Sequence, residues 1–290
     1  MTQKKHKVCD GRGVNLAAAV PHPPILVAGI GSAADLATAE ATCSAYARIA
    51  SEIVAARPEL IVFATPHGSV YRDCFLLSSG AHAKGSWHSF GRDPERYQIT
   101  YDEGFVAALA NQARDAGLPC LKRADPVLDH GVMVPLHFLL AAGLDVDSCK
   151  FARISISLLD EKTHYSLGRC VQQVAASLGL RTVFVASGDL SHRLKKSGSY
   201  GFAPEGPVFD EAMCQAFASG DFGRFFSFDE SFRDKAAECG LNSFLIMAGL
   251  FDGYEVNTEL YSYEGPWGVG YGVARFDRGN ANETRARPCL

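Results

Sequence analysis

The chain has 290 residues, a net charge of −4 and a hydrophobic fraction of 47%. These values are typical of a globular protein with one large or two small domains, and they give no electrostatic case for nucleic-acid binding. No apolar run reaches the roughly 20 residues that a membrane span needs. The nine cysteines are scattered and form no C-x-x-C pair, which indicates reduced thiols and a cytoplasmic protein.

Short apolar runs alternate with alanine-rich or amphipathic segments along the chain. In chain order they predict a strand at 14–20, a helix at 32–56, strands at 59–65 and 74–80, a helix at 101–117, a strand at 119–124, a helix at 131–142, a strand at 150–157, a helix at 161–179, a strand at 181–187, and helices at 207–218 and 241–251. Two β-rich segments, 254–264 and 268–276, predict a closing hairpin. The alternation predicts an α/β domain with a mostly parallel or mixed central sheet flanked by helices.

No linker rich in proline, glycine or serine and no internal repeat divides the chain. We therefore expect one catalytic domain over residues 14–277. A basic leader over residues 1–13 has no apolar segment of the kind found in secretory signals, and we expect it to be flexible. A polar tail covers residues 278–290.

Four histidines lie where α/β proteins bind ligands, beyond the carboxyl ends of strands. His22 follows the first predicted strand in "PHPP", and His67 follows the second in "TPHG". His192 follows a later strand in "SGDLSH", and His130 precedes a predicted helix in "LDHG". A single histidine in such a place is more often structural than functional. Four of them together predict a shared site.

Two imidazoles from separate strand ends are a common basis for a metal site, since iron, zinc and copper all accept them. A third ligand would come from a carboxylate, for which the candidates are Asp129, Asp189, Glu238 and Glu264. The thiol of Cys239 is a further alternative. Two histidines and one carboxylate form the metal site of many non-haem Fe(II) oxygenases. Zinc accepts the same ligands, so a metal-dependent hydrolase is an alternative.

The order of these motifs resembles the class III extradiol ring-cleaving dioxygenases, in particular their catalytic B-subunit (LigB-like) family. "PHPP", "TPHG", "LDHG" and "SGDLSH" occur in the family's order, and the resemblance extends from about residue 15 to 275. The segments "SGDLSHRL", "ECGL" and "YEGPWGVGYGVA" are most similar to the branch that contains the Memo family and the AmmeMemoRadiSam system. This resemblance implies a LigB-like fold and a non-haem Fe(II) enzyme that cleaves a catechol-type ring with O₂.

The resemblance also implies a role for each candidate. His22 and His67 correspond to the family's iron ligands, and Glu238 corresponds to its carboxylate ligand. Memo relatives have a cysteine at the corresponding place, which makes Cys239 the alternative third ligand. Zn(II) is the alternative metal.

The remaining motif residues correspond to groups around the metal. His192 matches the family's acid–base histidine, and His130 matches a histidine that contacts substrate or dioxygen. Asp129 and Asp189 are expected to orient these imidazoles. The expected partners are a small aromatic diol and O₂, with no nucleic acid or membrane, and either a homo-oligomer or a small partner subunit. A Memo-like metal-binding protein without ring-cleavage activity is the main alternative function.

Overall fold

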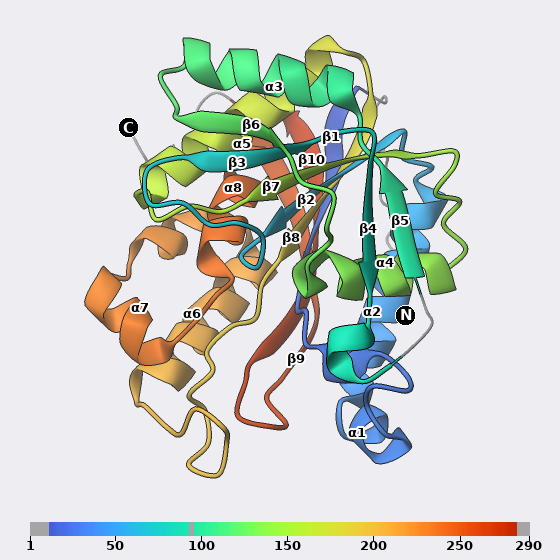
Figure 1. The fold of residues 1–290 in the computed structure, drawn as a ribbon. Helices are drawn as coiled ribbons and strands as arrows, with labels where there is room; N and C mark the ends of the chain where they lie inside the picture. Colours follow the sequence, from blue (N-terminus) through green and yellow to red (C-terminus); the bar gives the residue numbers. More distant parts are fainter. Residues whose placement is uncertain (1–11, 93–95, 283–290) are drawn as a thin grey trace.

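An eight-stranded mixed sheet forms the centre of the protein (Figure 1), in a computed structural model that describes residues 12–92 and 96–282. The strand order is β6 (Cys120–Ala124), β3 (Phe75–Ser79), β7 (Lys150–Ser155), β2 (Leu60–Thr65), β8 (Arg181–Ser187), β1 (Gly13–Val20), β10 (Tyr271–Ala281) and β9 (Tyr254–Glu264). The four strands β7, β2, β8 and β1 are parallel neighbours. Antiparallel pairs β3–β7, β1–β10 and β10–β9 make the sheet mixed. The predicted α/β fold with its closing hairpin is confirmed.

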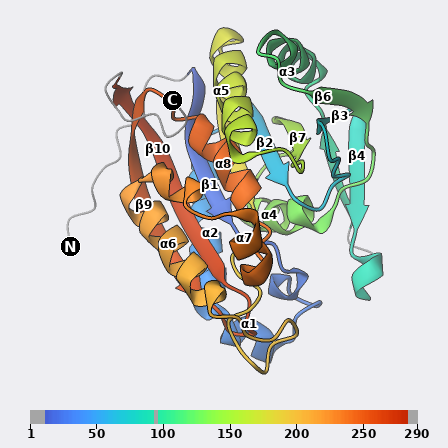
Figure 2. The same ribbon diagram turned by 90° about the vertical axis from the view of Figure 1, so that its left-hand side faces the viewer.

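The central strands are apolar on both faces because helices cover both sides. In β2, Leu60, Val62 and Ala64 pack on one side, while Ile61 and Phe63 pack on the other. The first side is covered by α3 (Glu103–Asp115), α5 (Glu161–Ser177), α6 (Glu205–Ser219) and α8 (Leu241–Gly249), and Figure 2 looks onto this layer. The second side is covered by α2 (Glu40–Ala55) and α4 (His130–Ala141).

Helices α5 and α8 pack so closely that their backbones touch. A Cβ atom on Gly168 of α5 would lie 1.9 Å from the carbonyl oxygen of Ile246. A Cβ atom on Gly249 of α8 would lie 1.9 Å from the carbonyl oxygen of Tyr165. Glycine is therefore required at both positions, and it sets how closely α5 and α8 approach each other.

Several elements differ from the sequence-based expectation. The predicted helix 32–56 is two helices, α1 (Ala33–Thr38) and α2, separated at Ala39, where ψ is 34°. Residues 82–100, where no helix or strand was expected, contain a second, two-stranded sheet, β4 (His82–Ser86) with β5 (Arg96–Thr100). Residues 222–232, where none was expected either, contain a 3₁₀ turn (Phe222–Phe226) and the start of α7 (Glu230–Ala236). These segments are short and their form depends on the neighbours they pack against, so periodicity does not reveal them.

Both ends of the sheet extend past the predicted domain boundaries of 14 and 277. Strand β1 begins at Gly13, the last residue of the expected leader, and strand β10 continues to Ala281, so the first residues of the expected polar tail belong to the sheet. Residues 1–11 of the expected leader and the tail from residue 283 lie outside the described residues. Within the described ranges, no helix is both long enough and apolar enough to cross a membrane.

Candidate metal centre

The parallel strands end in loops that carry the candidate site residues. His22 lies two residues after β1, His67 two residues after β2, and Asp189 two residues after β8. His130 is the first residue of α4, and Cys239 lies in the turn between α7 and α8. Since β2, β8 and β1 are adjacent, their carboxyl ends bring these side chains together at one edge of the sheet.

His22 is buried and held in one orientation and one tautomer. Its backbone N–H donates to Asp189 Oδ1 at 2.9 Å, and its ring Nδ1 lies 2.9 Å from Ser187 Oγ. The Ser187 hydroxyl donates its hydrogen to the carbonyl oxygen of Gly131 at 2.5 Å, so it accepts from His22 Nδ1–H. The Nε2 atom of His22 therefore carries the free lone pair, which is the form that binds a metal.

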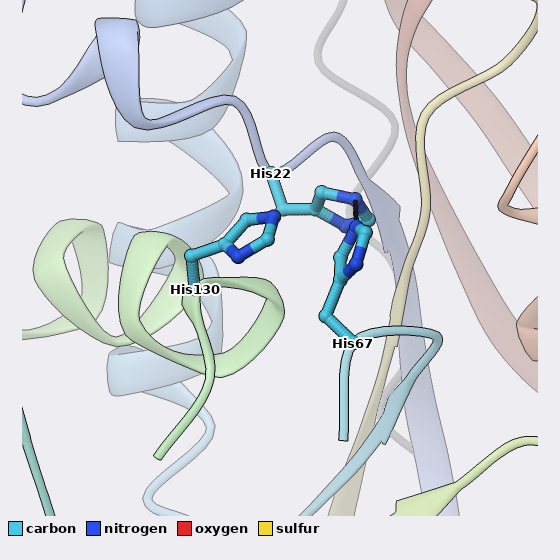
Figure 3. A group of neighbouring side chains, drawn as sticks. All are labelled: His22, His67 and His130. Carbon is cyan, nitrogen blue, oxygen red and sulfur yellow. Dashed lines mark hydrogen bonds between the residues drawn. The ribbon is translucent and has the colours of Figure 1, made fainter. Parts of the chain in front are cut away.

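The second imidazole and a thiol face this lone pair. His67 Nε2 lies 2.9 Å from His22 Nε2, and Cys239 Sγ lies 3.5 Å from the same atom. Figure 3 shows His22, His67 and His130 pointing toward one another from three separate segments. Two nitrogens bound to one ion at about 2.1 Å and at a right angle lie about 3.0 Å apart. The observed separation thus fits a pair of ligands on one shared ion.

Two sets of donor atoms overlap at His22. Nitrogen atoms of His22, His67 and His130 lie within 4.8 Å of one another, and so do donor atoms of His22, Asp189 and Cys239. His22 has only its Nε2 free, because Nδ1 is bonded to Ser187. The two sets therefore describe one ion position with alternative further ligands, rather than two separate ions. We refer to His22, His67, His130, Asp189 and Cys239 as the histidine cluster.

The carboxylate of Glu238 is engaged elsewhere. Its Oε1 accepts from Arg233 Nε at 2.8 Å, and its Oε2 accepts from the backbone N–H of Leu241 at 2.7 Å, at the start of α8. Glu264 is likewise occupied, because its Oε1 accepts from the N–H and the hydroxyl of Thr42. Among the described residues, the donor sets around His22 contain Cys239 and do not contain Glu238 or Glu264.

Two glycines bring Cys239 to this position. A Cβ atom on Gly188 would lie 2.1 Å from the Cα atom of Gly240, so the two backbones touch. The contact is reinforced by hydrogen bonds from Asp189 N to Cys239 Sγ at 3.3 Å and from Cys239 N to Asp189 O at 3.4 Å. Side chains larger than hydrogen at either glycine would separate Cys239 from the end of β8.

His130 and His192 flank the candidate ligands. The His130 ring lies 4.0 Å from the His67 ring and 5.5 Å from the His22 ring, between centroids. His192 Nε2 lies 3.9 Å from Asp189 Oδ2, and its Nδ1 is buried without a hydrogen-bond partner in the part of the chain that the structure describes. The structure thus places the sequence-predicted residues His130, His192 and Asp189 beside the two central imidazoles. It does not bring Glu238 to them.

Burial favours the neutral form of each titrating group in the cluster. It lowers the pKa of His22 well below its usual value, with further contributions from His130 and His192. It lowers the pKa of His67 to about 3 and also lowers that of His130. It raises the pKa of the Asp189 carboxyl and of the Cys239 thiol. Neutral imidazoles are the ligating form, whereas a thiol must lose its proton before it can bind a metal.

Two cavities reach the cluster from different sides. One, of about 970 Å³, ends at His130 and is bounded by β4, β5 and the start of α4, with Phe90, Tyr97, Val127 and Met133 in its wall. The other, of about 790 Å³, ends at Cys239 and is bounded by α7 and the start of α5. Each is large enough to hold a small organic ligand next to a donor atom of the cluster.

The chain matches one protein family over most of its length. Residues 16–274 match the family described as the catalytic LigB subunit of aromatic ring-opening dioxygenase. The chain belongs to the LigB family. LigB proteins generally bind a metal, and the histidine cluster is the group in the described residues that suits one.

One of two curated proteins similar to this chain belongs to the MEMO1 family. The chain is 30% identical over 267 residues to Protein CA_C1420 of Clostridium acetobutylicum, covering 89% of this chain and 56% of that protein. It is 25% identical over 196 residues to the MEMO1 family protein PF1638 of Pyrococcus furiosus, covering 66% of this chain and 56% of that protein. The chain therefore spans about half the length of these two relatives.

A solved structure shows the same fold. The uncharacterized protein JW3007 from Escherichia coli K12 superposes with a TM-score of 0.63 at 15% sequence identity, over 90% of this chain and 99% of that one. At this identity the likeness supports the LigB architecture alone.

Sequence reasoning missed two buried groups that support the cluster. Ser187, the last residue of β8, sets the tautomer of His22, and only its place at a strand end could have drawn attention to it. Arg153 is 1% exposed in β7 and forms an ion pair with Asp129. A charged residue inside the apolar run "KFARISIS" is a visible signal, because an arginine is buried only when it has partners.

Proposed function

We propose that this LigB protein is a non-haem Fe(II)-dependent extradiol dioxygenase that cleaves a catechol-type ring. The observation that carries the proposal is the meeting of two neutral imidazole Nε2 atoms, 2.9 Å apart, at the carboxyl edge of the parallel strands. The reaction needs no added reductant: one carbon–carbon bond beside the diol is broken, and both atoms of O₂ end in the product.

The donor set suits the metal. His22 and His67 would hold the ion, and Cys239 is favoured over Glu238 as the third ligand, because its Sγ lies 3.5 Å from His22 Nε2. Imidazole and thiolate ligands suit Fe(II) and also Zn(II). When bound, the metal would supply a Lewis acid that makes the diol a stronger acid and a centre at which diol and O₂ meet.

The protein's own groups would then handle the proton and the substrate. His192 would take a proton from a diol hydroxyl and return it to the opened product, and Asp189, 3.9 Å from its Nε2, would orient the ring. His130 would donate a hydrogen bond to oxygen atoms on the side of the larger cavity. Phe90 and Tyr97 in that cavity offer an apolar wall for an aromatic ring.

The proposal is tested by purifying the protein without oxygen, loading it with Fe(II) and measuring O₂ uptake over a panel of catechols. We expect one O₂ consumed for each diol opened. Replacing His192 with Gln should preserve Fe(II) binding and lower turnover by about 10²–10⁴-fold. Turnover unchanged in the His192→Gln protein would remove His192 from the acid–base role. Bound Fe(II) without O₂ uptake on any diol would contradict ring cleavage.

A second candidate is a Memo-like metal-binding protein without ring-cleavage activity. The feature that favours it is the thiol of Cys239 among the donors of His22, at a place where the resemblance to ring-cleaving enzymes implies a carboxylate ligand. The similarity to the MEMO1 family protein of Pyrococcus furiosus points the same way. Tight metal binding that depends on Cys239, together with a negative diol panel, would support this candidate over the first.

A further inference from the structure

Arg153 is a buried charge in the middle of the sheet. It lies on the same face of β7 as Phe151, the face covered by α4, whereas Ala152 and Ile154 lie on the opposite face. Its guanidinium donates to Ser78 Oγ at 2.9 Å and to the carbonyl oxygen of Val127 at 2.6 Å. It also forms ion pairs with the carboxylates of Asp125 and of Asp129, the latter at 3.3 Å.

A chain of hydrogen bonds connects Arg153 to the histidine cluster. Asp129 Oδ2 faces Arg153, and Asp129 Oδ1 accepts from Thr65 Oγ1 at 2.7 Å. Thr65 Oγ1 in turn accepts from the backbone N–H of His67 at 3.2 Å. Asp129 also immediately precedes His130 at the start of α4. One carboxylate thus connects Arg153 to the backbone of two histidines in the cluster.

The packing around this connection leaves little room for movement. A Cβ atom on Gly131 would lie 2.4 Å from Thr65 Oγ1 and 2.9 Å from Asp129 Oδ1. The first turn of α4 is therefore pressed against the end of β2 at the point where Asp129 and Thr65 meet. A shift of Asp129 would have to move the start of α4, and His130 with it.

We propose that Arg153 is a positioning residue of the metal centre. By binding the Asp129 carboxylate, it fixes the positions of His67 and His130. The inference rests on the proposed ligand role of His67. Arg153 belongs neither to the donor sets around His22 nor to the walls of the two cavities. Its planar fork satisfies three acceptors at once, Ser78 on β3 and both Val127 and Asp129 in the loop before α4, which the single nitrogen of a lysine does not do. Without the guanidinium, the carboxylates of Asp125 and Asp129 would face each other with no cation between them.

The test compares Arg153→Lys and Arg153→Met with a matched control, Arg275→Met. Arg275 has a side chain 12% exposed and also bridges two carboxylates, those of Glu52 and Asp277, but neither belongs to the cluster. The Co(II) dissociation constant and the visible spectrum of the Co(II) protein are measured. Amide hydrogen exchange of residues 65–69 and 126–134 is followed in the metal-free protein.

We expect both Arg153 variants to bind Co(II) about 10–100-fold more weakly and with an altered spectrum, as is typical when a group that orients a ligand is lost. Exchange should accelerate in both segments, and more in Arg153→Met than in Arg153→Lys. Arg275→Met should lower the melting temperature but leave the Co(II) dissociation constant within about twofold, since distant sites act independently.

Unchanged exchange in the two segments, or an equal effect of Arg275→Met on Co(II) binding, would overturn the inference. If Arg153→Met does not fold, Arg153→Lys and Asp129→Asn break the same connection and must give the same spectral change. A wild-type protein that binds no Co(II) would contradict the proposed metal centre. In that case the exchange data decide the role of Arg153 by themselves, because they need no metal.

Discussion

Two polar clusters lie side by side in this protein, one around the buried Arg153 and one around the buried His22, and they differ in the charge of their members. The arginine cluster consists of Arg153, Asp125 and Asp129. In it, opposite charges face each other directly. In the histidine cluster, burial shifts the pKa values toward neutral forms, lowering those of the imidazoles and raising those of Asp189 and Cys239. A cluster of charges that match one another holds structure together, whereas a cluster of neutral donors with converging lone pairs is suited to take up a cation.

The most severe way to break the histidine cluster is to remove its central donor. His22→Ala should weaken Co(II) or Fe(II) binding by more than about 100-fold, because both donor sets share its Nε2 atom and loss of a ligand exceeds loss of a supporting group. Metal titration against a chelator measures the change. His82→Ala, at an exposed imidazole on β4, is the matched control and should bind as wild type. Equal affinity of His22→Ala and wild type would contradict the site.

The raised pKa of Cys239 predicts a pH-dependent metal affinity. The thiol is protonated below about pH 9 and must release one proton when it binds as a thiolate, while the imidazoles, with lowered pKa values, are already neutral. Affinity should therefore rise about tenfold per pH unit between about pH 6 and 8. Cys239→Ser should flatten this dependence, and Cys43→Ser should leave it unchanged. A flat profile in the wild type would indicate that Cys239 is not a ligand.

A substitution at the contact between Gly188 and Gly240 tests whether metal binding depends on the position of Cys239, because it keeps every donor side chain. Gly188→Ala places a Cβ where the structure leaves 2.1 Å, so the two backbones must move apart. We expect a loss of about 1–3 kcal/mol in the free energy of unfolding and weaker metal binding, although every donor is still present. Gly104→Ala in α3, where the nearest atom lies 3.3 Å away, is the control and should not lower stability. Unchanged metal affinity in Gly188→Ala would show that Cys239 needs no exact placement.

The smallest expected effect tests how the His22 loop is held. The hydroxyl of Tyr46 donates to the carbonyl oxygen of Pro21 at 2.7 Å, next to His22. Tyr46→Phe should cost about 1 kcal/mol in chemical denaturation, because one buried hydrogen bond is lost, and should weaken metal binding only slightly. Tyr165→Phe removes a comparable bond to Asp252 outside the cluster and should affect stability alone. A larger loss of metal affinity in Tyr165→Phe would contradict this assignment.

Much of the fold follows from pattern, and the exceptions share a cause. Continuous apolar runs such as 59–65 and 181–187 predict the buried parallel strands, because a short run without polar alternation suits a strand covered on both faces. No strand was predicted at β4 or β5. Among the described side chains of this pair, only Ala83, Tyr97 and Ile99 are buried, and they join the apolar cluster that includes α4, so the strands depend on partners distant in the chain.

Some residues of the candidate site could likewise be predicted from the sequence, and others could not. The positions of His22, His67 and His192 after three apolar runs were enough to expect them near one another, because parallel strands end at one edge. The third donor could not be chosen, since Glu238 and Cys239 are neighbours in one turn. Arg153 could be noticed as a charge in an apolar run, but its partners could not be named.

The sequence by itself determined the α/β architecture, the order of the motifs and the edge of the sheet at which they meet. The tertiary structure decided which of two adjacent side chains faces His22. Neighbouring side chains in a turn point in different directions, and here the direction follows from contacts made across the chain. Gly188 against Gly240 brings Cys239 to the lone pair of His22, and Arg233 draws Glu238 into an ion pair.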